Sequence, residues 1–166
     1  SEESAGELLD RARERLDALR LDEPFFLYVH FMDPHVDYQA PEPWYGSWAD
    51  DYDSTVRGDS ATLTQLQDGT LTADDATVGR MLAFYDEEIA YVDEVVGSLL
   101  DDLTSAGVLE TTAVLVMGDH GEQFGDHGDW SHKHVWEELL HVPFVLWLPG
   151  QEPAAFDARV QTVDFT

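Results

Sequence analysis

Apolar positions recur every three to four residues in two stretches of the chain, and this spacing predicts two amphipathic helices. The first is expected over residues 5–20, with an apolar stripe of Leu8, Ala12, Leu16 and Leu19. The second is expected over residues 73–106, where the periodicity is carried by Met81, Phe84, Tyr85, Ile89, Val92, Val96, Leu99 and Leu103. Gly107 follows directly and suits the end of a helix.

Short apolar runs rich in aromatic and β-branched residues predict strands. They cover residues 25–31, 112–117 and 142–148, and a fourth strand is expected to start within 160–163. Runs that are apolar on both faces are typical of buried strands in a parallel sheet. With a further short helix around 132–141, helices alternate with strands, which predicts an α/β domain with a parallel or mixed sheet.

A long loop is predicted between the first strand and the second helix. Residues 32–72 contain several Pro and Gly breakers and few apolar residues. We interpret residues 39–72 as a loop insertion. Its aromatic residues Trp44, Trp48 and Tyr52 could form a lid that faces a substrate or a satellite hydrophobic cluster.

The charge narrows the possible partners. The 166 residues include 35 Asp and Glu but only 8 Lys and Arg, a net charge of −27. This balance argues against nucleic acid or an anionic membrane as a partner, and no apolar run has the length of a membrane span. The absence of Cys excludes disulfides and thiolate chemistry within the chain. Because the acidic residues are spread along the chain and Lys133 is its single lysine, we expect a protein of a halophilic cytoplasm or of brine. The alternative is a large calcium-binding surface, although the chain has no loop of the EF-hand type.

Polar clusters follow the predicted strands, where ligands bind in open α/β sheets. His35 comes after the first strand, and Asp119 and His120 come directly after the second. Five of the seven histidines lie between residues 120 and 141. A carboxylate beside an imidazole suits a divalent cation such as Ca²⁺, Mn²⁺ or Zn²⁺. The alternative is that Asp119 caps a turn and His120 packs inside.

The other candidates also have two interpretations. His35 could be a loop histidine without a role. Lys133, next to His132, is either a solvated side chain or a cation that binds an anionic substrate. The neighbouring residues Asp126, His127 and Asp129 could orient a ligating histidine or simply solvate a loop.

Several segments resemble the sulfatase family, and they follow one another in the family's order. Residues 26–38 resemble the segment that ends in a Pro-His pair, and residues 116–128 (VMGDHGEQFGDHG) resemble the metal-binding segment. Residues 86–107 resemble the helix between them. Residues 136–144 (WEELLHVPF) resemble the segment that ends in Val-Pro, and residues 163–166 the start of the next one.

This resemblance implies an alkaline-phosphatase-like fold, with a mixed or mostly parallel sheet flanked by helices, and hydrolysis of small anionic sulfate esters. By position, Asp119 and His120 would be ligands of one divalent cation, for which Ca²⁺ is expected and Mn²⁺ or Zn²⁺ are alternatives. His35 would contact the sulfate or the leaving-group oxygen. His132 would bind the substrate, or Lys133 would do so, one position away.

Two family motifs are missing from the chain. One is the Asp-Asp pair of the metal site, and the other is Cys/Ser-x-Pro-x-Arg, whose first residue becomes the formylglycine nucleophile. We therefore expect residues 1–166 to be a partial catalytic domain that is inactive alone, with the nucleophile outside it. Two alternatives stay open: a phosphatase or phosphonate monoester hydrolase, favoured by the Asp-His form of the metal pair, and a non-catalytic binding or structural domain. The oligomeric state is not predicted.

Overall fold

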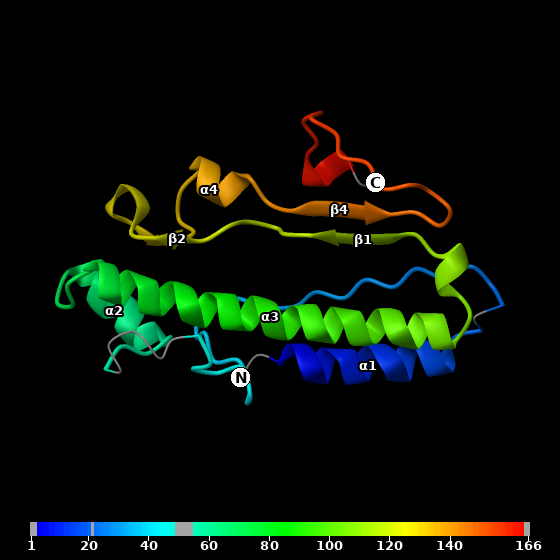
Figure 1. Ribbon diagram of the computed structural model, residues 1–166, viewed down its shortest axis with the longest axis horizontal. Helices are drawn as coiled ribbons and strands as arrows, with labels where there is room; N and C mark the ends of the chain where they lie inside the picture. Colours follow the sequence, from blue (N-terminus) through cyan, green and yellow to red (C-terminus); the bar gives the residue numbers. More distant parts are fainter. Residues whose placement is uncertain (1–2, 21, 49–54, 165–166) are drawn as a thin grey trace.

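The structure is a computed structural model that describes residues 3–20, 22–48 and 55–164. Its centre is the long helix α3 (Asp75–Ser105), as Figure 1 shows. Helices α1 (Ala5–Ala18) and α2 (Ser60–Asp68) lie on one side of α3. The strands and the short helix α4 (Glu137–Leu140) form a layer on the other side. The fold class is α/β, as predicted.

Helix α1 confirms the first predicted helix. A capping box starts it: the Ser4 side chain accepts the N–H of Glu7, and the Glu7 carboxylate accepts the N–H of Ser4. This helix buries Ala5, Leu9, Ala12 and Leu16. The predicted stripe is therefore wrong at its ends, because Leu9 is buried in place of Leu8 and Leu19 is exposed.

Helix α3 confirms the second predicted helix. The Asp74 side chain caps its start by accepting the N–H of Thr77, and Gly107 takes a left-handed φ of 73° just past its end. Towards the C-terminal part of α3, Leu103 packs with Leu16 of α1. The largest cluster lies at its N-terminal part and contains Tyr38, Val56, Leu66, Met81, Ala83, Phe84 and Trp130.

The predicted loop over 39–72 is not all loop, because it contains α2. The Asp59 side chain accepts the N–H of Thr62 at the start of α2, and Gly69 ends it with a φ of 75°. Both caps were visible in the sequence, but the helix has only a narrow apolar face, with Leu66 as its buried aliphatic residue.

The described part of the loop that carries Trp44 and Trp48 lies away from the histidines. The loop around residues 40–48 lies on the side of α3 away from β2 (Figure 1). There the Tyr45 ring stacks on Phe84 with ring centroids 5.1 Å apart. Trp48 is half exposed, and Tyr52 lies outside the described residues. Because Tyr45 was not among the three aromatic residues considered, neither interpretation is confirmed for Trp44 and Trp48.

Strands β1 (Val114–Met117) and β4 (Phe144–Trp147) confirm two of the predicted strands, but their pairing is antiparallel. Strands β2 (Gln123–Phe124) and β3 (Trp130–Ser131) form a second, short antiparallel pair. Among the described residues there is no parallel pair. The expected burial on both faces is also wrong for β4, where Val145 is 60 % exposed.

Residues 25–31, predicted as a central strand, pair with no strand in the described part of the chain. They are extended along α3 (Figure 1), and their burial alternates. Phe25, Leu27, Val29 and Phe31 are half-buried, whereas Phe26, Tyr28 and His30 are exposed. The pattern favoured an extended segment correctly, but a strand also needs a hydrogen-bonded neighbour.

The C-terminal strand prediction is wrong for the described residues. The 3-10 helix η3 (Thr162–Asp164) follows an exposed segment without regular structure, and Phe165 and Thr166 lie outside the described residues. The predicted short helix around 132–141 is confirmed only as α4. None of the described helices combines the length and the apolarity that crossing a bilayer requires.

Candidate active site

Asp119 and His120 lie in a turn that is fixed at both ends. Just before it, the N–H of Gly118 donates to the carbonyl oxygen of Pro143 at 3.1 Å. Just after it, the N–H of Gly121 donates to the carbonyl oxygen of Leu139 at 2.9 Å. A Cβ at Gly121 would clash with the carbonyl oxygen of Glu138, so this close approach requires glycine. The turn therefore has a defined position at the end of β1.

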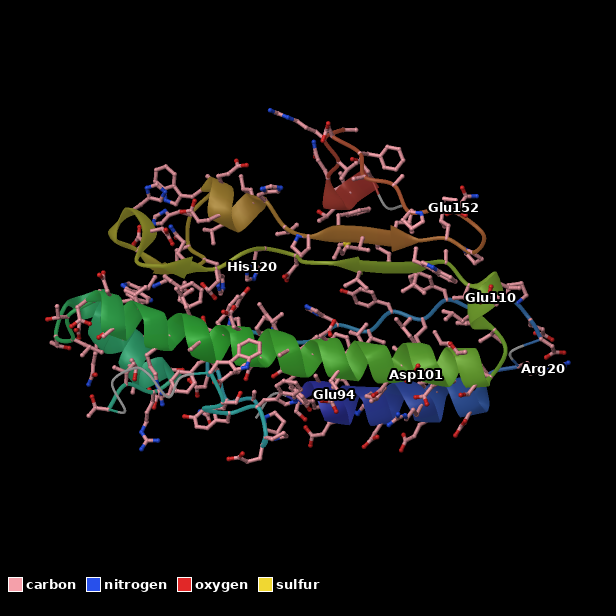
Figure 2. All side chains as sticks on the ribbon, viewed as in Figure 1. Arg20, Glu94, Asp101, Glu110, His120 and Glu152 are labelled. Carbon is pink, nitrogen blue, oxygen red and sulfur yellow. The ribbon has the colours of Figure 1, made fainter. Side chains whose placement is uncertain are left out.

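Three histidines from separate segments gather at this turn. The His120 ring stacks on the His132 ring with centroids 4.1 Å apart. The His35 ring lies 5.3 Å from the His132 ring. His120 lies between the strand layer and α3 in Figure 2. The sequence singled out all three residues, and the fold brings them together from positions far apart in the chain.

The Asp119 carboxylate stands beside two imidazoles. Its Oδ2 is 3.9 Å from Nε2 of His120 and 3.9 Å from Nε2 of His30. The side chain is 67 % exposed, so the carboxylate is open to a ligand. Sequence reasoning did not single out His30, although its place at an exposed position of the extended run, close to His35, was a usable signal.

The side chains of Asp119 and His120 suit a divalent cation, but the cation would need further ligands. Asp119 offers a carboxylate oxygen and His120 an imidazole nitrogen, both ordinary ligand types. Within the described ranges, no group of three His, Asp or Glu side chains is arranged to hold a metal ion. Since Ca²⁺ takes about six to eight ligands, these two residues would supply only part of its shell.

Glu122 is a functional candidate that sequence reasoning missed. Its side chain is 6 % exposed, and its Oε2 lies 3.3 Å from Nδ1 of His132. A hydrogen bond there leaves Nε2 of His132 as the free ring nitrogen. Burial, followed by the charge of Glu122, raises the pKa of Tyr38. A glutamate two residues after His120 was the available signal.

Two adjacent carboxylates of α3 are buried near the His35 segment. Glu87 is fully buried and accepts the N–H groups of Gly46 and Trp48 at 2.7 and 2.8 Å. Glu88 accepts the N–H of Gln39 at 2.6 Å. Burial, followed by the charge of Asp33, raises the pKa of Glu88 to about 8. Sequence reasoning counted both among the dispersed acidic residues.

The remaining polar candidates lie around the β2–β3 hairpin. Lys133 is exposed and lines a shallow pocket with His134, Val135 and Trp136. It makes no hydrogen bond or ion pair with the described residues, whereas its neighbour His132 contacts both His120 and Glu122.

The residues considered for orienting a ligating histidine have other contacts. Asp126 accepts the N–H of Phe124 at 3.1 Å. His127 pairs with Glu138 at 3.1 Å, and Asp129 pairs with His134 at 3.1 Å. These contacts favour the interpretation that the three residues serve their own loop.

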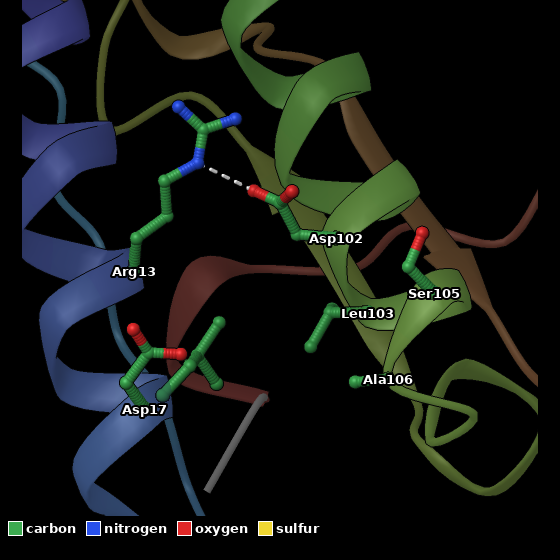
Figure 3. Close-up of a pocket in the computed structure, with 7 residues that line it drawn as sticks. Arg13, Asp17, Asp102, Leu103, Ser105 and Ala106 are labelled. Atoms are coloured by element: carbon green, nitrogen blue, oxygen red, sulfur yellow. Dashed lines mark hydrogen bonds and ion pairs between the residues drawn. The ribbon is translucent and has the colours of Figure 1, made fainter.

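A second pocket lies between α1 and α3, away from the histidines. It is lined by Arg13, Leu16, Asp17, Asp102, Leu103, Ser105 and Ala106. Arg13 and Asp102 form an ion pair of 2.7 Å across it, as Figure 3 shows. This pair joins the two helices, and the pocket contains none of the residues that the sequence singled out for chemistry.

The comparison with protein families decides the classification. The family model named Sulfatase matches residues 1–166. The chain belongs to the sulfatase family. It is 31 % identical to an arylsulfatase of Clostridium perfringens over 154 residues, covering 82 % of this chain and 31 % of that protein. It is 28 % identical to a choline-sulfatase of Rhizobium meliloti over 170 residues, covering 96 % of this chain and 33 % of that protein.

Solved structures show the same fold. The phosphonate monoester hydrolase of Silicibacter pomeroyi superposes with a TM-score of 0.69 at 21 % identity, over 91 % of this chain and 35 % of that one. The corresponding enzyme of Agrobacterium radiobacter gives a TM-score of 0.61 at 22 % identity, over 88 % of this chain and 32 % of that one. The fold is therefore alkaline-phosphatase-like, and the sulfatase chain spans about a third of its relatives' length.

Proposed function

We propose that the full-length protein hydrolyses sulfate esters and that this segment supplies part of its active site. The observation that carries the proposal is the gathering of His35, His120 and His132 beside Asp119. These residues stand at the positions where the chain resembles the family's metal-binding and substrate-binding segments. Membership in the sulfatase family supports the same activity.

Asp119 and His120 are the proposed ligands of a divalent cation, with Ca²⁺ as the expected ion. Such a cation would act as a Lewis acid that stabilises charge on the sulfate oxygens. The formylglycine nucleophile and the remaining ligands would come from a segment outside these residues. The isolated segment is accordingly expected to be inactive.

His132 is the proposed contact to the ester, together with His35. With its Nδ1 turned to Glu122, the free Nε2 of His132 can donate to a sulfate oxygen or protonate the leaving group. The contact with Glu122 would hold the His132 ring in this orientation. The exposed Lys133 is the competing candidate, because it lies one position after the residue to which the resemblance with the family points.

Turnover of an aryl sulfate by the full-length protein tests the activity. We expect the wild-type protein to hydrolyse the ester, to lose this activity on chelation and to recover it when Ca²⁺ is added. Asp119→Ala should be inactive. The matched control is Asp129→Ala, which removes a carboxylate of the β2–β3 hairpin and should leave turnover near wild type. Failure of the metal-loaded protein to hydrolyse any aryl ester would instead support a non-catalytic domain.

A second candidate is hydrolysis of phosphate or phosphonate esters. The imidazole of His120 in the proposed metal pair favours it, as the sequence indicated. Measuring kcat/KM for an aryl sulfate and an aryl phosphate with the same leaving group separates the two. A preference for the phosphate ester would decide for the second candidate.

A further inference from the structure

The segment that carries His35 is held on both sides of this residue by one side chain of α3. The Glu88 carboxyl group is only 1 % exposed, and its Oε1 accepts the backbone N–H of Gln39 at 2.6 Å. On the other side of His35, the Asp33 carboxyl group lies close enough to interact with Glu88. Asp33 also accepts the N–H of Ala5, the first residue of α1, at 2.7 Å.

These contacts need one proton between the two carboxyl groups. Glu88 Oε2 is buried and receives no hydrogen bond within the described part of the chain. Two facing carboxylates would repel each other, and an unsatisfied buried oxygen is costly. A proton on Glu88 solves both problems, because its O–H can donate to Asp33. The negative charge then stays on Asp33, where the N-terminus of α1 stabilises it.

We propose that protonated Glu88 is a positioning residue that, through Asp33 and Gln39, clamps the His35 segment to α3 and so sets the place of His35 beside His132. The inference rests on the proposed function, in which His35 contacts the ester. The clamp joins the residues before and after His35 to the middle of a rigid helix. Its loss would let His35 move away from the His132 ring.

The surroundings of Glu88 keep it neutral. Asp33 faces it from the loop, and Tyr38 lies near it. The next residue on the helix, Glu87, directs its own carboxylate to the N–H groups of Gly46 and Trp48. Burial and Asp33 raise the pKa of Glu88 from its ordinary 4.5 to about 8. Its contribution to stability is therefore complete below pH 4.5 and decreases until about pH 8.

Melting temperatures of the full-length protein across pH test the shared proton without any assay of activity. Glu88→Gln imitates the protonated acid, since its amide oxygen can accept from Gln39 and its amide N–H can donate to Asp33. We expect the melting temperature of the variant, relative to the wild type, to rise steadily from pH 4.5 to 8. Above pH 8 the difference between the two melting temperatures should stay constant. Glu94→Gln, at an exposed position of the same helix (Figure 2), should show no such trend. A Glu88→Gln difference that stays constant with pH overturns the proposal.

Steady-state kinetics with an aryl sulfate test the positioning role. Glu88→Gln should keep wild-type kcat, whereas Glu88→Ala should lower kcat by about ten- to a hundredfold with little change in KM. In a His35→Ala background, Glu88→Ala should cause no further loss, because the clamp acts through His35. Equal losses in both backgrounds, or a Glu88→Gln variant as poor as Glu88→Ala, overturn the role. Full turnover by His35→Ala would place the failure in the proposed function itself.

Discussion

Glu87 and Glu88 show how neighbouring residues of one type can meet different partners. Both are buried on α3, one turn after the buried Phe84. Glu87 offers both oxygens to backbone N–H groups, which suits a carboxylate. Glu88 meets one N–H and one carboxyl group, which suits a neutral acid. Because the partners differ, the same substitution by glutamine is expected to affect the two positions differently.

Glu87→Gln is expected to destabilise the protein, in contrast to Glu88→Gln. The amide nitrogen of glutamine would face the N–H of Gly46 or Trp48 and leave one buried donor without a partner. We expect a loss of about 1–3 kcal/mol in the free energy of unfolding. Urea denaturation of the full-length protein at neutral pH measures it. An unchanged midpoint would mean that water replaces the lost acceptor.

Replacing His132 or Lys133 by alanine, one at a time, shows which of the two residues contacts the ester. We expect His132→Ala to lower kcat/KM for an aryl sulfate by about a hundredfold, the scale for one preorganised donor. Lys133→Ala should have a mild effect, because the side chain is exposed and makes no hydrogen bond or ion pair with the described residues. The reverse pattern would assign the anion contact to Lys133. Measuring kcat/KM of each variant for aryl sulfates with good and with poor leaving groups shows whether His132 also donates a proton.

At the scale of elements, the turn after β1 makes the candidate site depend on backbone packing. Gly121→Ala would press a Cβ against the carbonyl oxygen of Glu138 in α4. We expect a destabilisation of about 1–3 kcal/mol, typical of overpacking, together with weaker cation binding. Thermal melting and titration with Ca²⁺ measure the two effects.

Gly97→Ala is the matched control for this turn. Gly97 lies in α3, and a Cβ there would meet nothing within 4 Å. The substitution should stabilise the protein by up to about 1 kcal/mol, because alanine is the better helix former. Equal effects of the two substitutions would contradict the requirement for glycine at residue 121.

The sequence predicted elements whose signal is local and missed those that depend on a partner. Helices α1 and α3 followed from apolar spacing, and β1 and β4 from their composition. The antiparallel direction of β4 and the unpaired state of residues 25–31 depend on neighbouring backbone, which no periodicity reveals. Helix α2 was missed because only its caps, and not its apolar content, indicated it.

The candidate site shows the same division. The sequence singled out His35, His120 and His132 through their place after strands and their resemblance to family segments. It did not single out Glu88 or Glu122, because a chain with 35 acidic residues gives no composition signal for a carboxylate that is buried. A usable signal for Glu88 was its spacing of four residues from Phe84, which puts both on one helix face.

At the scale of the whole molecule, the acidic residues are distributed over all layers. Figure 2 shows Glu94 and Asp101 on α3, Glu110 in the 3-10 helix η1 (Leu109–Thr111) and Glu152 after β4. With 35 acidic and 8 basic residues, the chain carries a large excess of negative charge. Their mutual repulsion is distributed over the surface and opposes the compact state.

Salt is therefore expected to stabilise the full-length protein, as it does proteins of organisms that live in concentrated salt. At 1 M ionic strength the Debye length is only about 3 Å, so repulsion between exposed carboxylates on different elements is screened. We expect the melting temperature to rise between dilute buffer and molar KCl. The same series in molar NaCl separates screening from binding of a particular cation, since screening depends only on ionic strength. A melting temperature that stays flat or falls with KCl would contradict adaptation to high salt, and the charge of −27 would then need another explanation.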